Sequence, residues 1–204
     1  MTAAIILIVA VVVGGGAVLA FNGLVRDRVR TREAWSQIDV ELTRRHDLIP
    51  NLVETVKGYA AHERGTFEAV TAARAGALTA QASSDPARVG TAENVLTGSL
   101  RTLFAVAENY PQLRAVESFL HLQEQLTATE DKLEFARHFY NTSVRDYDVA
   151  IQTFPRSVLA RVFGFRRAGF FQADADHREA RPLGVTGPGA PTADRVRPHG
   201  PRTP

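Results

Sequence analysis

Residues 119–154 read FLHLQEQLTATEDKLEFARHFYNTSVRDYDVAIQTF, and a large apolar side chain recurs there at every seventh position. Mostly smaller side chains stand between them, so large and small residues alternate along one seam. This repeat predicts a long α-helix packed lengthwise against other helices, either unbroken or bent near residues 127–129. The large positions are Phe119, Leu126, Leu133, Tyr140, Tyr147 and Phe154, and the interleaved ones are Leu122, Thr129, Ala136, Ser143 and Ala150.

Four internal prolines divide the rest of the helical sequence. Proline has no backbone N–H and fits the first turn of a helix, where that donor would have no partner. Three of the prolines follow a residue that can cap a helix. The predicted helices run from the apolar N-terminus to about residue 47, then over about 48–81, 86–108 and 111–153. The prolines are Pro50, Pro86, Pro111 and Pro155, and the caps are Asp47, Asp85 and Asn109.

Strand-type alternation is absent from this sequence. We therefore predict an all-α fold, with an antiparallel four-helix bundle and coiled-coil-like packing. An N-terminal helix from Ala3 to Phe21 precedes the bundle and carries no charged or amide side chain. A bilayer core needs about 20 such residues, so this run predicts a single-pass transmembrane helix. A cleaved signal peptide is the alternative, although the segment before the run lacks a basic residue.

The basic residues around the apolar run predict its orientation. Arg26, Arg28, Arg30 and Arg32 follow the run, and no Lys or Arg precedes it. The positive-inside rule then places the N-terminus outside and the helical domain in the cytoplasm, at a bacterial plasma membrane. Small residues spaced by four around Gly14–Gly16 permit close packing, which makes self-association through this helix an expectation.

Composition excludes several classes of function. The chain has 204 residues and no Cys, so disulfides, Cys-based zinc sites and Cys nucleophiles are absent. Its net charge is only +2, so bulk attraction to nucleic acid is not expected. No Gly-x-Ser-x-Gly elbow, kinase signature or phosphate-binding loop occurs. We expect no catalysis and no cofactor.

The histidines do not form a metal-binding pattern. His62-Glu63 begins like a zinc-protease motif, but Thr66 stands where the second His is required. The pairs Glu117/His121 and Glu134/His138 are spaced by four, whereas a di-iron bundle site needs a spacing of three. No metal site is therefore predicted.

A basic and aromatic segment follows the last predicted helix, over residues 156–178. Such a segment suits a membrane surface, with rings at the acyl boundary and arginines at anionic headgroups. An up-down bundle would also return this segment to the membrane. The alternative is that the aromatic rings cap the end of the bundle core. The residues predicted to touch the membrane surface are Phe163, Arg166, Arg167, Phe170 and Phe171.

The last segment, residues 179–204, is rich in Pro and Gly and lacks apolar periodicity. It is predicted to be disordered. The expected organisation is a transmembrane helix and flank over 1–25, the bundle over 26–155, the basic aromatic segment over 156–178 and this tail.

Three stretches resemble the LemA family of bacterial membrane proteins. They are AWSQIDVELTRRHDLIPNLVETVKGYAAHE at 34–63, ARHFYNTSVRDYDVAIQTFP at 136–155, and FGF at 163–165. The resemblance covers about residues 3–171 and departs from the family pattern at Tyr147-Asp148, where the family usually reads YN. It implies a transmembrane helix followed by a helical bundle, and no known catalytic activity.

Polar residues gather in the first two of these stretches. One group should surround the turn between the first two helices, and the other lines the fourth helix. They fit turn capping and interhelical hydrogen bonds that set the register of the bundle, or a docking face for another protein. The residues are Asp39, Arg44, Arg45, Asp47, Asn51, Arg137 and Asn141.

The sequence thus favours a membrane-anchored helical scaffold or protein-interaction module, whose partners are the lipid bilayer and an unidentified protein. The alternative is a regulator or adaptor of a membrane protease or envelope-stress system. A hydrolase would need convergent titratable groups in a pocket, and the predicted helices show none.

Overall fold

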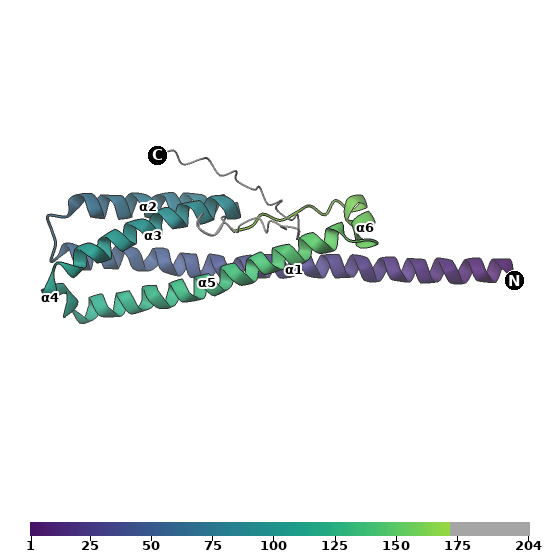
Figure 1. Cartoon of the computed structure of the whole chain (residues 1–204), viewed down its shortest axis with the longest axis horizontal. Coiled ribbons are helices and arrows are strands. Elements are labelled where there is room, and N and C mark those ends of the chain that lie inside the picture. The colour runs from purple at the N-terminus through teal and green to yellow at the C-terminus, as the bar shows by residue number, and fades with distance from the viewer. Residues whose placement is uncertain (172–204) are drawn as a thin grey trace, which may run out of the picture. The chain divides into compact units, whose positions relative to one another are not determined.

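The computed structural model describes residues 1–171, and within that range the chain is all-helical with no strand. The predicted all-α class is thereby confirmed for this part. The predicted tail at 179–204 and the end of the basic aromatic segment at 172–178 lie outside the described residues. In Figure 1 the long helices run in alternating directions. They are α1 Thr2–Lys57, α2 Arg64–Ala82, α3 Pro86–Glu108, α4 Pro111–Arg114, α5 Glu117–Gln152 and α6 Arg156–Val162.

The longest helix, α1, corrects the predicted boundary between the first two helices. It passes through Pro50 without a break and ends at Lys57, so no turn occurs near residue 47 and Asp47 caps no helix. A proline inside a helix leaves the carbonyl four residues earlier without its usual donor. Here the Nε–H of Arg74 on α2 donates to the His46 carbonyl oxygen at 2.7 Å. A tertiary contact thus replaces the missing donor, which a proline rule cannot anticipate.

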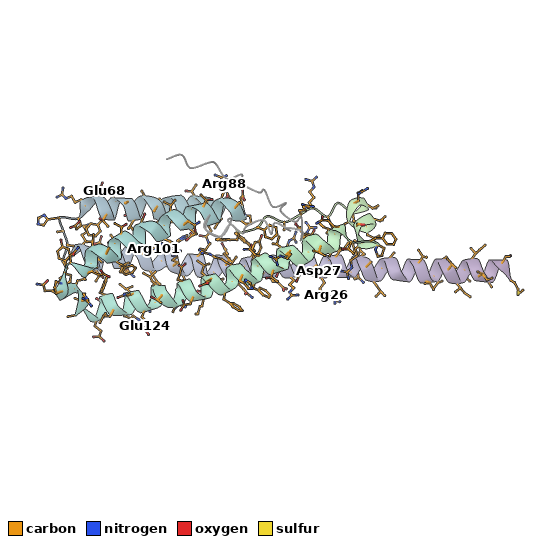
Figure 2. All side chains as sticks on the ribbon, viewed as in Figure 1. Arg26, Asp27, Glu68, Arg88, Arg101 and Glu124 are labelled. Atoms are coloured by element: carbon orange, nitrogen blue, oxygen red, sulfur yellow. The ribbon has the colours of Figure 1, made fainter. Side chains whose placement is uncertain are left out.

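The first part of α1 contacts little else in the described chain. Its large apolar side chains from Ile5 to Leu19 are each more than half exposed. This helix is long and apolar enough to cross a membrane. Figure 2 shows its first charged side chains, Arg26 and Asp27, on the part of α1 that packs against α5. An apolar helix whose side chains are not covered by other protein segments has the composition expected of a helix that faces lipid.

Two predicted helices are interrupted: residues 58–63 break the one over 48–81, and residues 115–116 divide the one over 111–153 into α4 and α5. The start of α3 follows the sequence more closely. Helix α3 begins at Pro86 as predicted, and the Asp85 carboxylate accepts a hydrogen bond from the Ala87 N–H at 3.1 Å. Asn109 closes α3 and does not cap the next helix, whose N-cap is Tyr110. Helix α5 runs unbroken through residues 127–129, which decides between the two forms that the sequence left open.

Two clusters make up most of the core. The distal cluster joins α1, α2, α3 and α5 around residues such as Leu52, Val70 and Leu103. The second cluster lies nearer the apolar end of α1, around Ile38 and Tyr140, and joins α1 and α5 to the end of α2, the start of α3 and Phe171. All predicted large seam positions of α5 are buried except Phe154, which follows the end of the helix and is exposed. Knobs-into-holes geometry of the coiled-coil kind stays a prediction.

The chain returns to the beginning of the packed part of α1. Leu24 of α1, Ala150 of α5 and Ala160 of α6 form a third, small apolar cluster. The Phe21 ring lies 4.8 Å from the Phe163 ring, centroid to centroid. Segment 163–171 therefore starts beside the last residue of the apolar run, as the up-down order of helices predicted.

Candidate functional site

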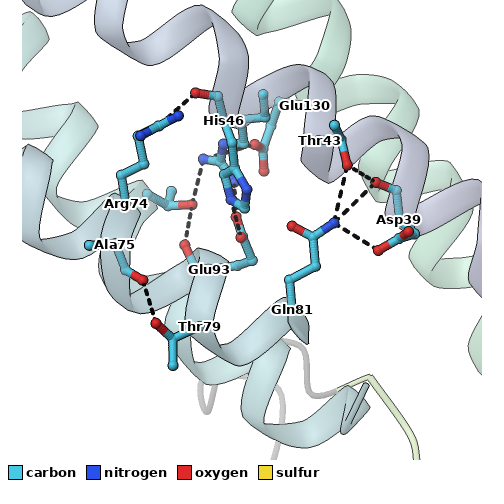
Figure 3. Close-up of polar contacts among 11 residues, drawn as sticks. Asp39, Thr43, His46, Arg74, Ala75, Thr79, Gln81, Glu93 and Glu130 are labelled. Carbon is cyan, nitrogen blue, oxygen red and sulfur yellow. Dashed lines mark hydrogen bonds and ion pairs between the residues drawn. The ribbon is translucent and has the colours of Figure 1, made fainter. Parts of the chain in front are cut away.

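A buried group of charged side chains joins α1 to α3 (Figure 3). Arg45 Nη1 lies 3.1 Å from Glu93 Oε2, and His46 Nε2 lies 2.8 Å from Glu93 Oε1. Both oxygens of the Glu93 carboxylate are thus engaged, which is what a fully buried charge requires. We call Arg45, His46 and Glu93 the buried charge cluster.

Arg45 also contacts two side chains outside this cluster. Its Nη2 donates to Thr97 Oγ1 at 2.8 Å and lies 3.2 Å from Glu130 Oε2 on α5. One guanidinium therefore connects α1, α3 and α5. The planar fork of arginine suits such a multi-directional contact, whereas lysine would supply only a point charge.

The buried charge cluster suits a structural role better than a chemical one. Glu93 and His46 are fully buried and Arg45 is almost so, which keeps these groups from any solute. Within residues 1–171 no three His, Cys, Asp or Glu side chains converge in a way that could hold a metal ion. A paired charge of this kind specifies which helix faces meet, because every misaligned packing leaves a charge unpaired.

Sequence reasoning named Arg45 but missed His46 and Glu93. The missed signal was position. Glu93 follows Val89 by four residues and precedes Leu96 by three, so a charged residue stands on the apolar stripe of α3. His46 stands in the same relation to Leu42 and Ile49 on α1. Polar side chains on both apolar stripes were a sign that they contact one another.

The remaining members of the first predicted polar group do not surround a turn, because all lie inside α1. Asp39 accepts a hydrogen bond from Gln81 Nε2 of α2 at 2.7 Å (Figure 3). Arg44, Asp47 and Asn51 are exposed. Of this group, the structure brings only Arg45 into the buried charge cluster.

The two members on α5 hold the segment that follows α6. Asn141 clamps the backbone of Phe171: its Nδ2 donates to the carbonyl oxygen at 3.1 Å, and its Oδ1 accepts from the N–H at 3.0 Å. The Arg137 guanidinium lies 4.9 Å from the centre of the Phe171 ring. The Tyr140 hydroxyl donates to the Gly169 carbonyl oxygen at 2.7 Å, and burial raises the pKa of Tyr140 to about 12.

These contacts correct the prediction for Phe171. Its side chain is only 1% exposed and packs near Trp35 and Tyr140, so it belongs to the core and does not meet a membrane surface. The alternative reading, in which the aromatic rings close the core, holds for this residue. Phe163, Arg166, Arg167 and Phe170 are exposed.

Exposed apolar side chains lie within α6 and on either side of it. Phe154, Val158, Val162 and Phe163 are each more than half exposed. Arg156 fixes α6 on α1 through Asp27, with Nη1 and Oδ2 3.4 Å apart. We call Phe154, Val158, Val162 and Phe163 the α6 collar. The collar lies where the apolar run of α1 ends.

Comparison with known proteins identifies a family. The model of the LemA family matches residues 34–183. The chain is 28% identical to magnetosome protein MamQ 2 of Paramagnetospirillum magneticum over 178 residues, which cover 76% of this chain and 65% of that protein. It is 23% identical to protein LemA of Metamycoplasma hominis over 158 residues, which cover 77% and 71%. The chain thus spans just under two thirds of the length of this MamQ relative.

Proposed function

The chain belongs to the LemA family, and on that premise we propose that it is a single-pass, non-catalytic scaffold that holds a partner protein at the cytoplasmic face of a bacterial membrane. The observation that carries the proposal is the continuity of α1. One helix without a break joins the exposed apolar run to the packed helices. A continuous helix would hold the distal helices at a fixed distance from the membrane. The coiled-coil-like packing predicted for those helices would keep it stiff.

A groove between α1 and α5 supplies a face for the partner. Val40 is 62% exposed and Phe135 is 70% exposed in this groove, and the groove is lined by three carboxylates, of Glu33, Glu41 and Asp131, and by one cation, Lys132. Glu41 Oε2 is closed off from solvent without a hydrogen-bond partner in the described part of the chain. Apolar anchors ringed by carboxylates fit a basic amphipathic helix of a partner protein.

We do not extend a role in magnetosomes to this chain on the basis of the relatives that carry that name. The chain covers 65% of one MamQ protein and 58% of the MamQ protein of Magnetospirillum gryphiswaldense. We therefore propose a shared helical membrane module only. An adaptor of a membrane protease differs from the scaffold only in the identity of the partner.

Site-specific photocrosslinking in native membranes tests the groove. A photoreactive residue at Phe135 should give a discrete protein adduct, whereas one at Val95, an apolar position on α3 that is 59% exposed, should not. The Glu41→Gln/Asp131→Asn pair should reduce the adduct at position 135. Equal adducts at both positions, or none at position 135, would reject a partner in this groove.

Orientation has a direct test because the chain has no Cys. A membrane-impermeant maleimide should label Thr2→Cys in intact cells and Ala61→Cys only after lysis. The reverse pattern would place the helices outside the cytoplasm. Labelling of both positions in intact cells would contradict a single crossing.

The α6 collar extends the anchor if it touches lipid. We propose that Phe163, next to Phe21, contacts the membrane surface together with Val158 and Val162. In a Trp35→Phe background, F163W should be quenched by brominated lipids in reconstituted full-length protein. V95W serves as the distal control, and equal quenching of both would reject the contact.

A further inference from the structure

A cavity of about 660 Å³ opens between α1, α5 and segment 163–171. Four arginines line it: Arg28 and Arg32 from α1, and Arg166 and Arg167 from the segment. No carboxylate is among the lining residues, which also include Trp35 and Tyr147. Cavities of about 300–1,000 Å³ commonly hold small ligands.

The arginines of this cavity differ from Arg45 and Arg156 in the groups that they contact. Arg45 and Arg156 each pair with a carboxylate. By contrast, Arg167 Nη2 donates to the neutral Gln152 Oε1 at 2.8 Å, and Arg28 lies 5.9 Å from the centre of the Phe165 ring. Arg32 and Arg166 form no ion pair within residues 1–171.

Like charges placed together raise the free energy of the empty cavity. Arg28 and Arg32 stand four residues apart on one face of α1, a spacing at which equal charges repel. The opposite wall adds two further guanidinium groups next to each other in sequence. An anion would convert this repulsion into attraction, so the arrangement is complementary to negative charge.

Tyr147 adds a neutral donor to the wall. Its side chain is 2% exposed, and its hydroxyl donates to no residue in the part of the chain that the structure describes. Burial raises its pKa; the charges of Arg28 and Arg32 act in the opposite direction, and the charge of Asp148 adds to the rise. The hydroxyl therefore stays protonated at neutral pH and lies within the field of the arginines.

We propose that this cavity binds a phosphate-bearing anion, supplied by a soluble phosphate compound or by the headgroup of an anionic phospholipid. Guanidinium groups match phosphate oxygens with two parallel hydrogen bonds, which distinguishes phosphate from a simple halide. Arg28 follows Phe21 by seven residues, about 10 Å along a helix. The cavity therefore begins close to the expected headgroup layer. Binding here needs no protein partner, so it stands apart from the proposed scaffold role.

Trp35 makes the test specific, because it is the single tryptophan of the chain and lines the cavity. Full-length protein in an uncharged maltoside detergent is titrated with inorganic pyrophosphate, and then separately with dioctanoyl phosphatidylglycerol, while Trp35 emission is recorded. Saturation by pyrophosphate identifies a soluble anion as sufficient. Saturation by the lipid alone identifies the headgroup as the source.

Matched variants separate the cavity from general basicity. R32Q/R166Q removes two cavity arginines and should weaken binding at least about tenfold, because each lost charged hydrogen bond has an effect of this order. R26Q/R161Q removes the same charge from two exposed positions outside the cavity and should stay within about twofold of the parent chain. Circular dichroism confirms that both variants remain helical.

Two results would overturn the proposal. One is the absence of a saturable Trp35 response with both probes. The other is an equal loss of binding in the two double variants, which would reduce the effect to overall charge.

Discussion

The distal and proximal halves of the helical part both contain charged and apolar side chains, but they place these side chains differently. The distal half, where α2 and α3 cover α1 and α5, buries its charges and pairs them internally, as in the buried charge cluster. The proximal half, built from α1, α5, α6 and segment 163–171, leaves arginines around an open cavity and apolar side chains on the α6 collar. Cover by four helices allows both oxygens of Glu93 to be paired, whereas the proximal half leaves arginines and apolar side chains open to other molecules.

The largest effect should come from breaking the distal cluster. Glu93→Leu removes the buried carboxylate that contacts Arg45 and His46, leaves Arg45 only its ion pair with the partly exposed Glu130, and should lower the free energy of unfolding by about 3–5 kcal/mol. Urea unfolding of full-length protein in detergent, followed by circular dichroism, measures the loss. The Arg45→Met/Glu93→Leu pair removes both charges and should recover most of the stability. If the pair is no more stable than the single variant, the cluster does not act through an unpaired charge.

In the proximal half, Phe171→Ala should be the most damaging change. Removing a buried ring costs about 3–5 kcal/mol in a core, and we expect the lower end because segment 163–171 can detach locally. Phe163→Ala is the matched control, and its exposed ring should cost less than about 1 kcal/mol. Unfolding curves of both variants test the difference. Equal losses would mean that the two rings are equally buried in solution.

A smaller effect is expected at Asn141, which clamps the same segment by hydrogen bonds alone. Asn141→Ala removes both bonds to the Phe171 backbone and should cost about 1–3 kcal/mol. Asn51→Ala on α1 should cost less than about 0.5 kcal/mol, because that side chain is exposed. The Trp35 emission should shift in the first variant and not in the second, since Trp35 packs near Phe171. A shift in neither would show that the clamp does not position the segment.

The smallest effect at neutral pH concerns Tyr140. Its pKa is raised from 10.0 to about 12 by burial, so the folded chain keeps the proton after the unfolded chain has lost it. Stability from this group is therefore complete below pH 10 and decreases as the pH rises towards 12. Alkaline unfolding monitored by circular dichroism should be shallower in Tyr140→Phe over that window. An unchanged profile would contradict a buried, protonated Tyr140.

Much of the fold was predictable from local patterns. The heptad seam of α5 identified its buried face from Phe119 to Tyr147, and Pro86 with Asp85 located the start of α3. The same proline rule was wrong at Pro50, because the donor that makes a helical proline tolerable comes from Arg74, in another helix. A rule based on neighbours in sequence has no access to that partner.

The candidate sites were less predictable. The sequence identified Arg45, Arg137 and Asn141 as polar residues of interest, but it put Arg45 at a turn and Phe171 at a membrane surface. Glu93 was missed because its partners stand more than forty residues away in the chain. The arginine-lined cavity joins residues of α1 to residues more than a hundred positions later, so its composition depends on how the chain returns.

Some features of this protein therefore depend on local sequence, and others depend on how its helices pack. Helix content, the apolar run and the buried stripe of each helix depend on side-chain spacing along the chain, which fixes direction within a helix. Which charges pair, which proline is tolerated and which arginines share a cavity depend on the packing of helices against one another. Pairing of buried charges is decided by distances across helices, and spacing within one helix carries no information about them.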